Sequence, residues 1–314
     1  MDPRVERFKE WMTSVRRLQG GTVYAYGETL RYFAEWIDMS DLEAITSQDI
    51  EAFMSRERAR VKIGMPSTQD RDRVALMAFW KWAVAHGEAV GNPTLDVAVP
   101  KVRSRKPKAV DDDLWARLWG AEMPVEDRAW LGLMCFAGLR RREVVSLTPP
   151  QVDAKRGLLM YLSRKGGNED VVEYAEMVRI VASGLPKVCP EPRAFLDEVA
   201  LHAERREGEH RFLTMDKPAS QTMRDRASFG HDPWMPDPHV INYRLMKLLG
   251  MAGLPRTQFS PHALRHTCVT NLLRCGVPIE VVSDAVGHSN IDTTRRYVKT
   301  AGRLVEWRQR LEKR

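Results

Sequence analysis

Hydrophobic positions recur at helical spacing through the first hundred residues of the chain. From Thr22 onward, apolar side chains follow one another at steps of four, three and four, which places them on one face of a helix. They are Tyr26, Leu30, Phe33 and Ile37. Two capping-box patterns, Thr46–Asp49 and Ser67–Asp70, each precede another apolar segment, and Gly87 and Gly91 end the second one. The pattern predicts four short helices and no strand.

The rest of the chain combines helical patterns with one predicted hairpin. Residues 125–139 form a long apolar stretch that we interpret as a core helix. Two short apolar runs, 157–162 and 171–174, flank the turn residues Lys165–Asn168, which is typical of a β-hairpin. Helical patterns dominate again from Glu191 onward. The sequence therefore predicts a mostly α protein with a small β-sheet.

Length and composition narrow the class of protein. The 314 residues, 43% hydrophobic and 29% charged, fit about two globular domains. The longest apolar run, Trp130–Leu139, is shorter than the roughly 18 residues that a membrane-spanning helix needs. The N-terminus lacks an apolar signal core, and the four cysteines form no CxxC pair. We therefore expect a cytoplasmic protein without a zinc or disulfide framework. Residues 214–238, rich in Pro, Asp and Ser, are predicted to form a loop.

Charge points to a polyanionic partner. The chain carries 49 basic and 42 acidic side chains, a net charge of +7. A segment around residues 99–110 has no periodicity and gathers five basic residues, which is compatible with a solvated connector or with a strap on a phosphate backbone. These residues are Lys101, Arg103, Arg105, Lys106 and Lys108.

Six reactive side chains follow one another in the second half of the chain. In order they are Arg140, Lys165, His262, Arg265, His288 and Tyr297. His262 and Arg265 are three residues apart at the start of a predicted helix, so they share one face. Each residue alone has an ordinary interpretation, such as an arginine answering a helix dipole, a solvated turn lysine or a packing tyrosine. All six in this order favour a common site.

The order, flanking residues and spacings resemble the tyrosine recombinase (phage integrase) family. The resemblance rests on A-G-L-R-x-x-E ending at Glu143, the turn lysine, H-x-x-R, G-H and the final tyrosine, and it covers residues 111–314. It implies an N-terminal helical core-binding (SAM-like) domain at 1–98 and a basic linker at 99–110. A mixed α+β catalytic domain at 111–297 and a C-terminal helix at 298–314 would follow. This helix would dock on a neighbouring protomer, or else on its own core.

The residue types suit attack on a phosphodiester. Two guanidinium groups, Arg140 and Arg265, can hold the non-bridging oxygens on which charge develops. Tyr297 would attack as the nucleophile and form a phosphotyrosyl link. The resemblance implies that Lys165 protonates the leaving 5′-oxygen, although Arg164 stands where the family usually has a small residue.

The remaining candidates have supporting roles. His262 would take the tyrosine proton, and His288 would donate to a non-bridging oxygen. Glu143 would orient Arg140 or stay solvated, and Arg141 and Arg142 would contact backbone phosphates or solvent. His266 is expected on the other side of its helix from His262, without a catalytic role. The resemblance implies no metal and no cofactor.

The implied function is site-specific DNA recombination. The enzyme would cleave and rejoin duplex DNA through a 3′-phosphotyrosyl intermediate and exchange strands between two sites through a Holliday junction, without ATP. Its partners would be paired half-sites and further copies of the chain: a tetramer on two DNA sites, and a monomer or weak dimer in solution. A compact phage integrase or a Xer-like resolvase fits this description. The alternatives are a type IB topoisomerase-like enzyme and a catalytically silent DNA-binding relative.

Binding to DNA should weaken steeply with salt. Each phosphate that a basic side chain neutralises should contribute a slope of about −0.9 to the logarithm of affinity against the logarithm of salt concentration. Neutralising the five basic residues of segment 99–110 should flatten this slope in a fluorescence-anisotropy titration. An unchanged slope would remove the segment from the interface.

Overall fold

A computed structural model describes residues 2–18, 20–56, 66–101, 109–163, 169–189, 191–209, 211–213, 238–288 and 290–298. These residues form two compact units, one from the first hundred residues and one from residue 109 onward. Several predicted features lie outside the described residues. They are Lys165, Arg103, Arg105, Lys106 and Lys108, the loop at 214–237 and the tail after Val298.

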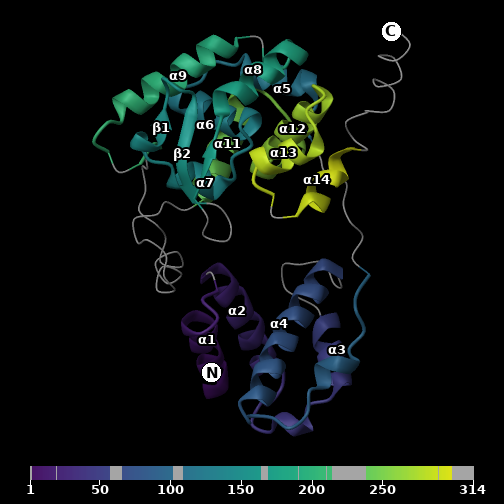
Figure 1. Cartoon of the computed structure of the whole chain (residues 1–314). Helices are drawn as coiled ribbons and strands as arrows, with labels where there is room; N and C mark the ends of the chain where they lie inside the picture. The colour runs from purple at the N-terminus through teal and green to yellow at the C-terminus, as the bar shows by residue number, and fades with distance from the viewer. Residues whose placement is uncertain are drawn as a thin grey trace. The chain divides into compact units, whose positions relative to one another are not determined.

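The N-terminal unit confirms the four predicted helices, and its described residues contain no strand. Its helices are α1 (Pro3–Ser14), α2 (Gly20–Trp36), α3 (Ser47–Ser55) and α4 (Pro66–Ala85), with short 3-10 turns at Leu42–Ala44 and Pro93–Asp96 (Figure 1). Thr46 caps α3 as predicted, and its backbone N–H donates to the Asp49 carboxylate at 2.9 Å. Ser67 lies inside α4, so the second predicted cap is wrong.

Aromatic side chains join these four helices into one core. Phe8, Phe33, Phe53 and Phe79, one from each helix, are fully buried together with Trp80. The ring of Phe33 meets those of Phe53 and Trp80 edge-on, at centroid distances of 4.9 and 5.6 Å. Such pairs add directional contacts to the free energy gained by apolar burial. Figure 1 shows the resulting bundle as its purple and blue part.

The C-terminal unit is mostly helical with one small sheet, as predicted. Its helices are α5 (Asp112–Trp119), α6 (Val125–Phe136), α7 (Arg141–Ser146), α8 (Tyr174–Gly184), α9 (Pro192–Arg205), α11 (His239–Met251), α12 (Pro261–Arg274), α13 (Ile279–Ala285) and α14 (Ile291–Val298). Short 3-10 turns lie at Pro149–Gln151 and Arg256–Gln258. No described helix is long and apolar enough to cross a membrane.

The sheet is antiparallel in the order β1 (Val152–Asp153), β2 (Leu158–Ser163), β3 (Glu169–Val172). Leu159 pairs with Val152 on one side and with Val172 on the other. The predicted hairpin is confirmed in its two strands. However, Tyr174 begins α8 instead of ending a strand, and the two-residue β1 was too short to give a sequence signal.

Helix α6 forms the centre of this unit. All of its residues from Ala129 to Phe136 are buried, and α9 and α12 both pack on it. The helix ends at Phe136, earlier than the apolar pattern predicted, because Gly138 takes a left-handed conformation with φ of 66°. At Gly132 the ring of Phe195 on α9 lies so close that an added Cβ would come within 2.1 Å of it.

The first residues of this unit hold α12 at its middle and at its C-terminal end. The backbone N–H of Val110 donates to the hydroxyl of Thr267, in the middle of α12, at 2.8 Å. At the C-terminal end of α12, Arg274 donates to both carboxylate oxygens of Asp112 at 2.9 and 2.7 Å. These contacts fix the helix that begins with Pro261 and His262.

Replacing Gly132 with alanine should destabilise this unit. The new methyl group would overlap the Phe195 ring, and overpacking of this kind typically costs about 1–3 kcal/mol. Urea unfolding measures the change in the free energy of unfolding. Gly250→Ala is the matched control, because a Cβ there meets no described atom within 4 Å and alanine favours a helix. Equal stability of the two variants would contradict the close packing of α6 on α9.

Candidate active site

Two arginines share one buried carboxylate. Arg140 is the N-cap residue of α7, where its backbone N–H and its Nη1 donate to the two oxygens of Glu143, both at 2.7 Å. Nη1 of Arg265, on α12, lies 4.0 Å from Oε2 of the same carboxylate. Glu143 is only 3% exposed. This carboxylate therefore fixes the two guanidinium groups next to each other.

Backbone carbonyls hold the same guanidinium groups from other directions. Arg265 donates to the carbonyls of Gly138 and Val286, the second at 2.5 Å. Arg140 donates to the carbonyl of Gly287 at 2.6 Å. Gly138 and Gly287 have φ of 66° and 65°, a conformation that favours glycine. The glycines of the A-G-L-R and G-H motifs thus shape the backbone that holds both arginines.

The Tyr297 side chain lies among three histidine rings. Its hydroxyl is hydrogen-bonded to Nδ1 of His266, and the two ring centroids are 5.0 Å apart. The His262 ring lies 4.1 Å from that of His266, and the His288 ring lies 6.3 Å from that of Tyr297. Tyr297 is only 2% exposed. The hydroxyl is therefore held inside the unit in this state.

His266 corrects a prediction from the sequence. We expected it on the other side of its helix from His262, but the two rings are in contact. Residues four apart on a helix lie on the same face, so the spacing itself was the signal that was missed. The predicted core helix 125–139 also does not reach Arg140, because it ends at Phe136 and Arg140 caps the next helix, α7.

The histidines of this site are held neutral. Burial, followed by the positive charge of Arg265, lowers the pKa of His288 to about 3. Burial, followed by His262 and Arg265, lowers the pKa of His266 to about 4. Partial burial of the His262 ring, followed by the charges of Arg265 and Arg140, also lowers the pKa of His262, although part of its side chain is exposed. Nδ1 of His288 is hydrogen-bonded to the buried Thr294 hydroxyl at 2.7 Å. These imidazoles are available as neutral donors or acceptors at pH 7.

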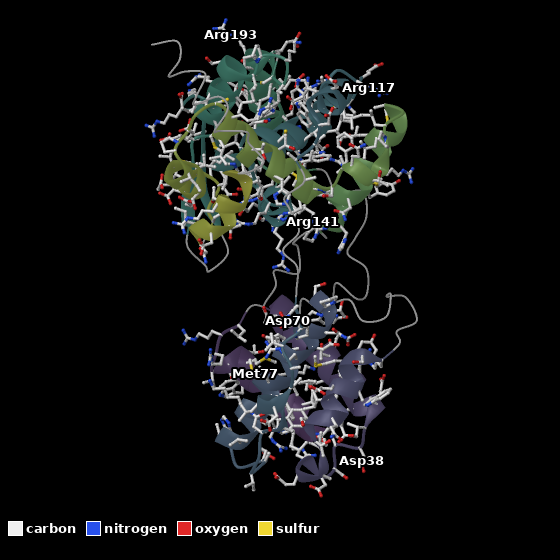
Figure 2. All side chains as sticks on the ribbon, turned by 90° about the vertical axis from the view of Figure 1, so that its right-hand side faces the viewer. Asp38, Asp70, Met77, Arg117, Arg141 and Arg193 are labelled. Atoms are coloured by element: carbon white, nitrogen blue, oxygen red, sulfur yellow. The ribbon has the colours of Figure 1, made fainter. Side chains whose placement is uncertain are left out.

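Five of the six sequence-predicted residues converge through these contacts, and Lys165 lies outside the described residues. The five are Arg140, His262, Arg265, His288 and Tyr297. Glu143 lies between the arginines. Arg141 is half-buried, donates to Asn242 on α11 at 3.0 Å, and lies at the edge of the unit (Figure 2). Arg142 and Lys101 are exposed. Among the described residues, no group of three His, Cys, Asp or Glu side chains is arranged to hold a metal ion.

Two protein-family models match this chain. Residues 113–303 match the model of the phage integrase family, and residues 5–86 match that of the phage integrase N-terminal SAM-like domain. The chain belongs to the phage integrase family. Its N-terminal unit is a SAM-like domain and its C-terminal unit is the catalytic domain, as the sequence resemblance implied.

Individual relatives agree with this assignment. The chain is 27% identical to tyrosine recombinase XerD of Shewanella oneidensis over 98% of its own length and 96% of the relative. It is also 27% identical to tyrosine recombinase XerC of Pelobacter propionicus, over 98% and 95%. The structure of a lambda integrase dimer bound to a COC' core site matches 94% of this chain and 76% of that one, with a TM-score of 0.67 at 16% identity. The post-cleavage complex of XerH with a palindromic difH substrate gives a TM-score of 0.59 at 15% identity, over 99% and 85%.

The free energy of unfolding should decrease as the pH falls from 7 to 5. Four histidines of the catalytic domain have a pKa below the usual 6.5, so the unfolded chain binds more protons in this range. They are His202, His262, His266 and His288. Stability is thus complete above about pH 6.5 and is lost toward pH 4. Since one pKa unit corresponds to about 1.4 kcal/mol and solvent screens the exposed His262, we expect a loss on the order of 1–3 kcal/mol.

Calorimetry of the catalytic-domain transition at the two pH values measures this loss. His202→Gln should reduce the difference, because it removes one titrating ring. Its amide can still donate to the Phe212 carbonyl, which Nε2 of His202 contacts at 2.7 Å. An identical free energy of unfolding at pH 7 and pH 5 would contradict the neutral state of these histidines.

Proposed function

We propose that this chain is a site-specific DNA recombinase that cuts and rejoins strands through Tyr297. The observation that carries the proposal is that α12 brings Arg265, paired with Arg140 on Glu143, together with the histidines that surround the Tyr297 hydroxyl. Support also comes from relatives that are named tyrosine recombinases and from matching folds that were solved with DNA.

In this proposal the two arginines bind the scissile phosphate with different exposure. The side chain of Arg140 is 30% exposed, so its guanidinium group is the first to meet the incoming phosphate. The side chain of Arg265 is 3% exposed, so its guanidinium group binds the phosphate from the buried side of the site. Both are preorganised by Glu143 and by backbone carbonyls, and they need little rearrangement when charge develops on the phosphate oxygens. Fixed donors of this kind typically contribute about 3–4 kcal/mol each to a transition state.

The Tyr297 oxygen attacks phosphorus, and the bond from phosphorus to the 5′-oxygen breaks. Tyr297 becomes joined to the 3′-phosphate, and Lys165 gives a proton to the leaving 5′-oxygen. His288 donates from Nε2 to a non-bridging oxygen, because Nδ1 is engaged by the Thr294 hydroxyl. His262 is exposed, lies three residues before Arg265 on α12, and contacts the phosphate from the same helix. Since Tyr297 is buried here, its hydroxyl must become accessible before it attacks.

Strand exchange follows when the 5′-hydroxyl of a partner duplex attacks the phosphotyrosyl bond. Two such exchanges pass through a Holliday junction and need no ATP, since the covalent link conserves the bond energy. Four protomers on two pairs of half-sites, connected by the helix at 298–314, would perform them. One of the matching structures is a lambda integrase tetramer bound to a Holliday junction. In this arrangement, backbone phosphates contact the basic segment 99–110, Arg141 and Arg142. We also propose that the N-terminal domain ends at residue 98 and that the catalytic domain begins at residue 111.

Replacing the nucleophile tests the proposal. A library of nicked duplexes with randomised core sequence traps covalent adducts, which denaturing gels separate and sequencing identifies. Tyr297→Phe should lower adduct formation by at least about 1,000-fold while retaining DNA binding. Tyr243→Phe, at a tyrosine that is 72% exposed on α11, is the matched control and should form adducts normally.

The same substrates separate the competing functions. A recombinase joins strands from two different duplexes that carry the recovered sequence. Relaxation of supercoiled DNA without such joining would indicate a type IB topoisomerase-like enzyme. DNA binding without any adduct in the unmodified chain would indicate a silent relative. An adduct that persists in Tyr297→Phe would refute Tyr297 as the nucleophile.

A further inference from the structure

One contact of the Tyr297 hydroxyl involves a histidine that takes no part in binding the phosphate. Nδ1 of His266 is hydrogen-bonded to the Tyr297 hydroxyl, the atom that would attack phosphorus. His266 lies on α12, one residue after Arg265, and Tyr297 lies on α14, which packs on both α12 and α13. The contact therefore connects the helix that carries the H-x-x-R residues to the helix that carries the phenol.

We propose that His266 is a catalytic residue whose Nδ1 accepts the proton of the Tyr297 hydroxyl as that oxygen attacks the phosphate. This inference rests on the proposed function. It replaces His262 in the role that the sequence suggested for it. His266 touches the reacting oxygen directly, whereas His262 is exposed and is in ring contact with His266.

The proton and electron balance of the step is complete with residues of the chain. A lone pair of the Tyr297 oxygen forms the new bond to phosphorus, and the electron pair of the broken bond leaves on the 5′-oxygen. The phenolic proton moves to Nδ1 of His266, and Lys165 protonates the 5′-oxygen. In rejoining, the imidazolium of His266 returns its proton to the departing phenolate. A neutral imidazole with its proton on Nε2 has the lone pair on Nδ1 that this transfer requires.

The electrostatic surroundings favour a base that is activated by the substrate. At rest the pKa of His266 is about 4, lowered first by burial and then by His262 and Arg265. The groups that face it are His262 and Arg265 from α12 and Tyr297 from α14, and His288 lies beyond the phenol. A phosphate bound by Arg265 offsets that positive charge and raises the pKa of His266. The imidazole then becomes a better proton acceptor when DNA is in place.

His266→Asn tests the transfer with little change in shape. The asparagine amide keeps a hydrogen-bonding group near the place of Nδ1 but cannot take a proton. In single-turnover reactions on the nicked duplex recovered from the library, its adduct should form about 100-fold more slowly at pH 7. Its rate should also rise with pH toward the phenol pKa of roughly 10. His202→Gln, in the same domain but outside the site, should keep the rate of the unmodified chain.

A fluorinated tyrosine at position 297 distinguishes proton transfer from a structural role. Its phenol ionises near neutral pH and needs less help from a base, so in His266→Asn it should restore adduct formation to within about 10-fold of the unmodified chain. A His266→Asn rate within threefold of the unmodified chain would overturn the inference. A slow rate that fluorination does not restore would also overturn it, because His266 would then only support the fold.

Two further measurements keep the result unambiguous. If Tyr297→Phe loses the adduct while His266→Asn behaves normally, only the inference fails; if Tyr297→Phe keeps the adduct, the proposed function fails. Should His266→Asn not fold, histidine ¹⁵N NMR of the unmodified chain replaces it. The proposal requires the proton of His266 on Nε2 and a shift of its Nδ1 signal in Tyr297→Phe. A proton on Nδ1 would overturn it.

Discussion

The buried guanidinium group of Arg265 is the charge on which the rest of the site depends. A cation that is 3% exposed is stable only when its lost hydration is replaced, and here two backbone carbonyls and the nearby Glu143 carboxylate replace it. The same positive charge, together with burial, keeps the neighbouring imidazoles neutral. The positions of α7, α12 and the Gly287 turn are thus coupled, because α12 carries Arg265, α7 contributes Glu143 and the turn contributes carbonyls to both arginines.

Much of the fold followed from hydrophobic periodicity and turn chemistry. Helices α2, α3 and α4 of the SAM-like domain and the strands β2 and β3 were visible because each has a clear spacing or flanking signal, whereas the fourth predicted helix had no such signal assigned to α1. The ends of helices were harder to predict where the backbone conformation of a single residue decides them. The apolar pattern continued to Leu139, yet α6 ends at Phe136 because of the conformation of Gly138. Packing of this kind depends on contacts between distant segments, which no local pattern records.

The site was predictable in its residue types but not in its internal contacts. Motif order located both arginines and the tyrosine, since these residues carry chemistry that few other side chains supply. The role of Arg140 as the N-cap residue of α7 depends on a hydrogen bond to Glu143, which the apolar pattern before it does not indicate. The predicted position of His266, on the other side of its helix from His262, was wrong. Its four-residue spacing from His262 puts both rings on one face of α12.

The entry of the chain into the catalytic domain has a mechanical consequence. Val110 is bonded to Thr267 in the middle of α12, and Asp112 is paired with Arg274 at its end. The polypeptide that precedes residue 109 is thus tied almost directly to the helix that bears His262, Arg265 and His266. Tension on that polypeptide would reach these side chains through two short links, without passing through the sheet or through α6.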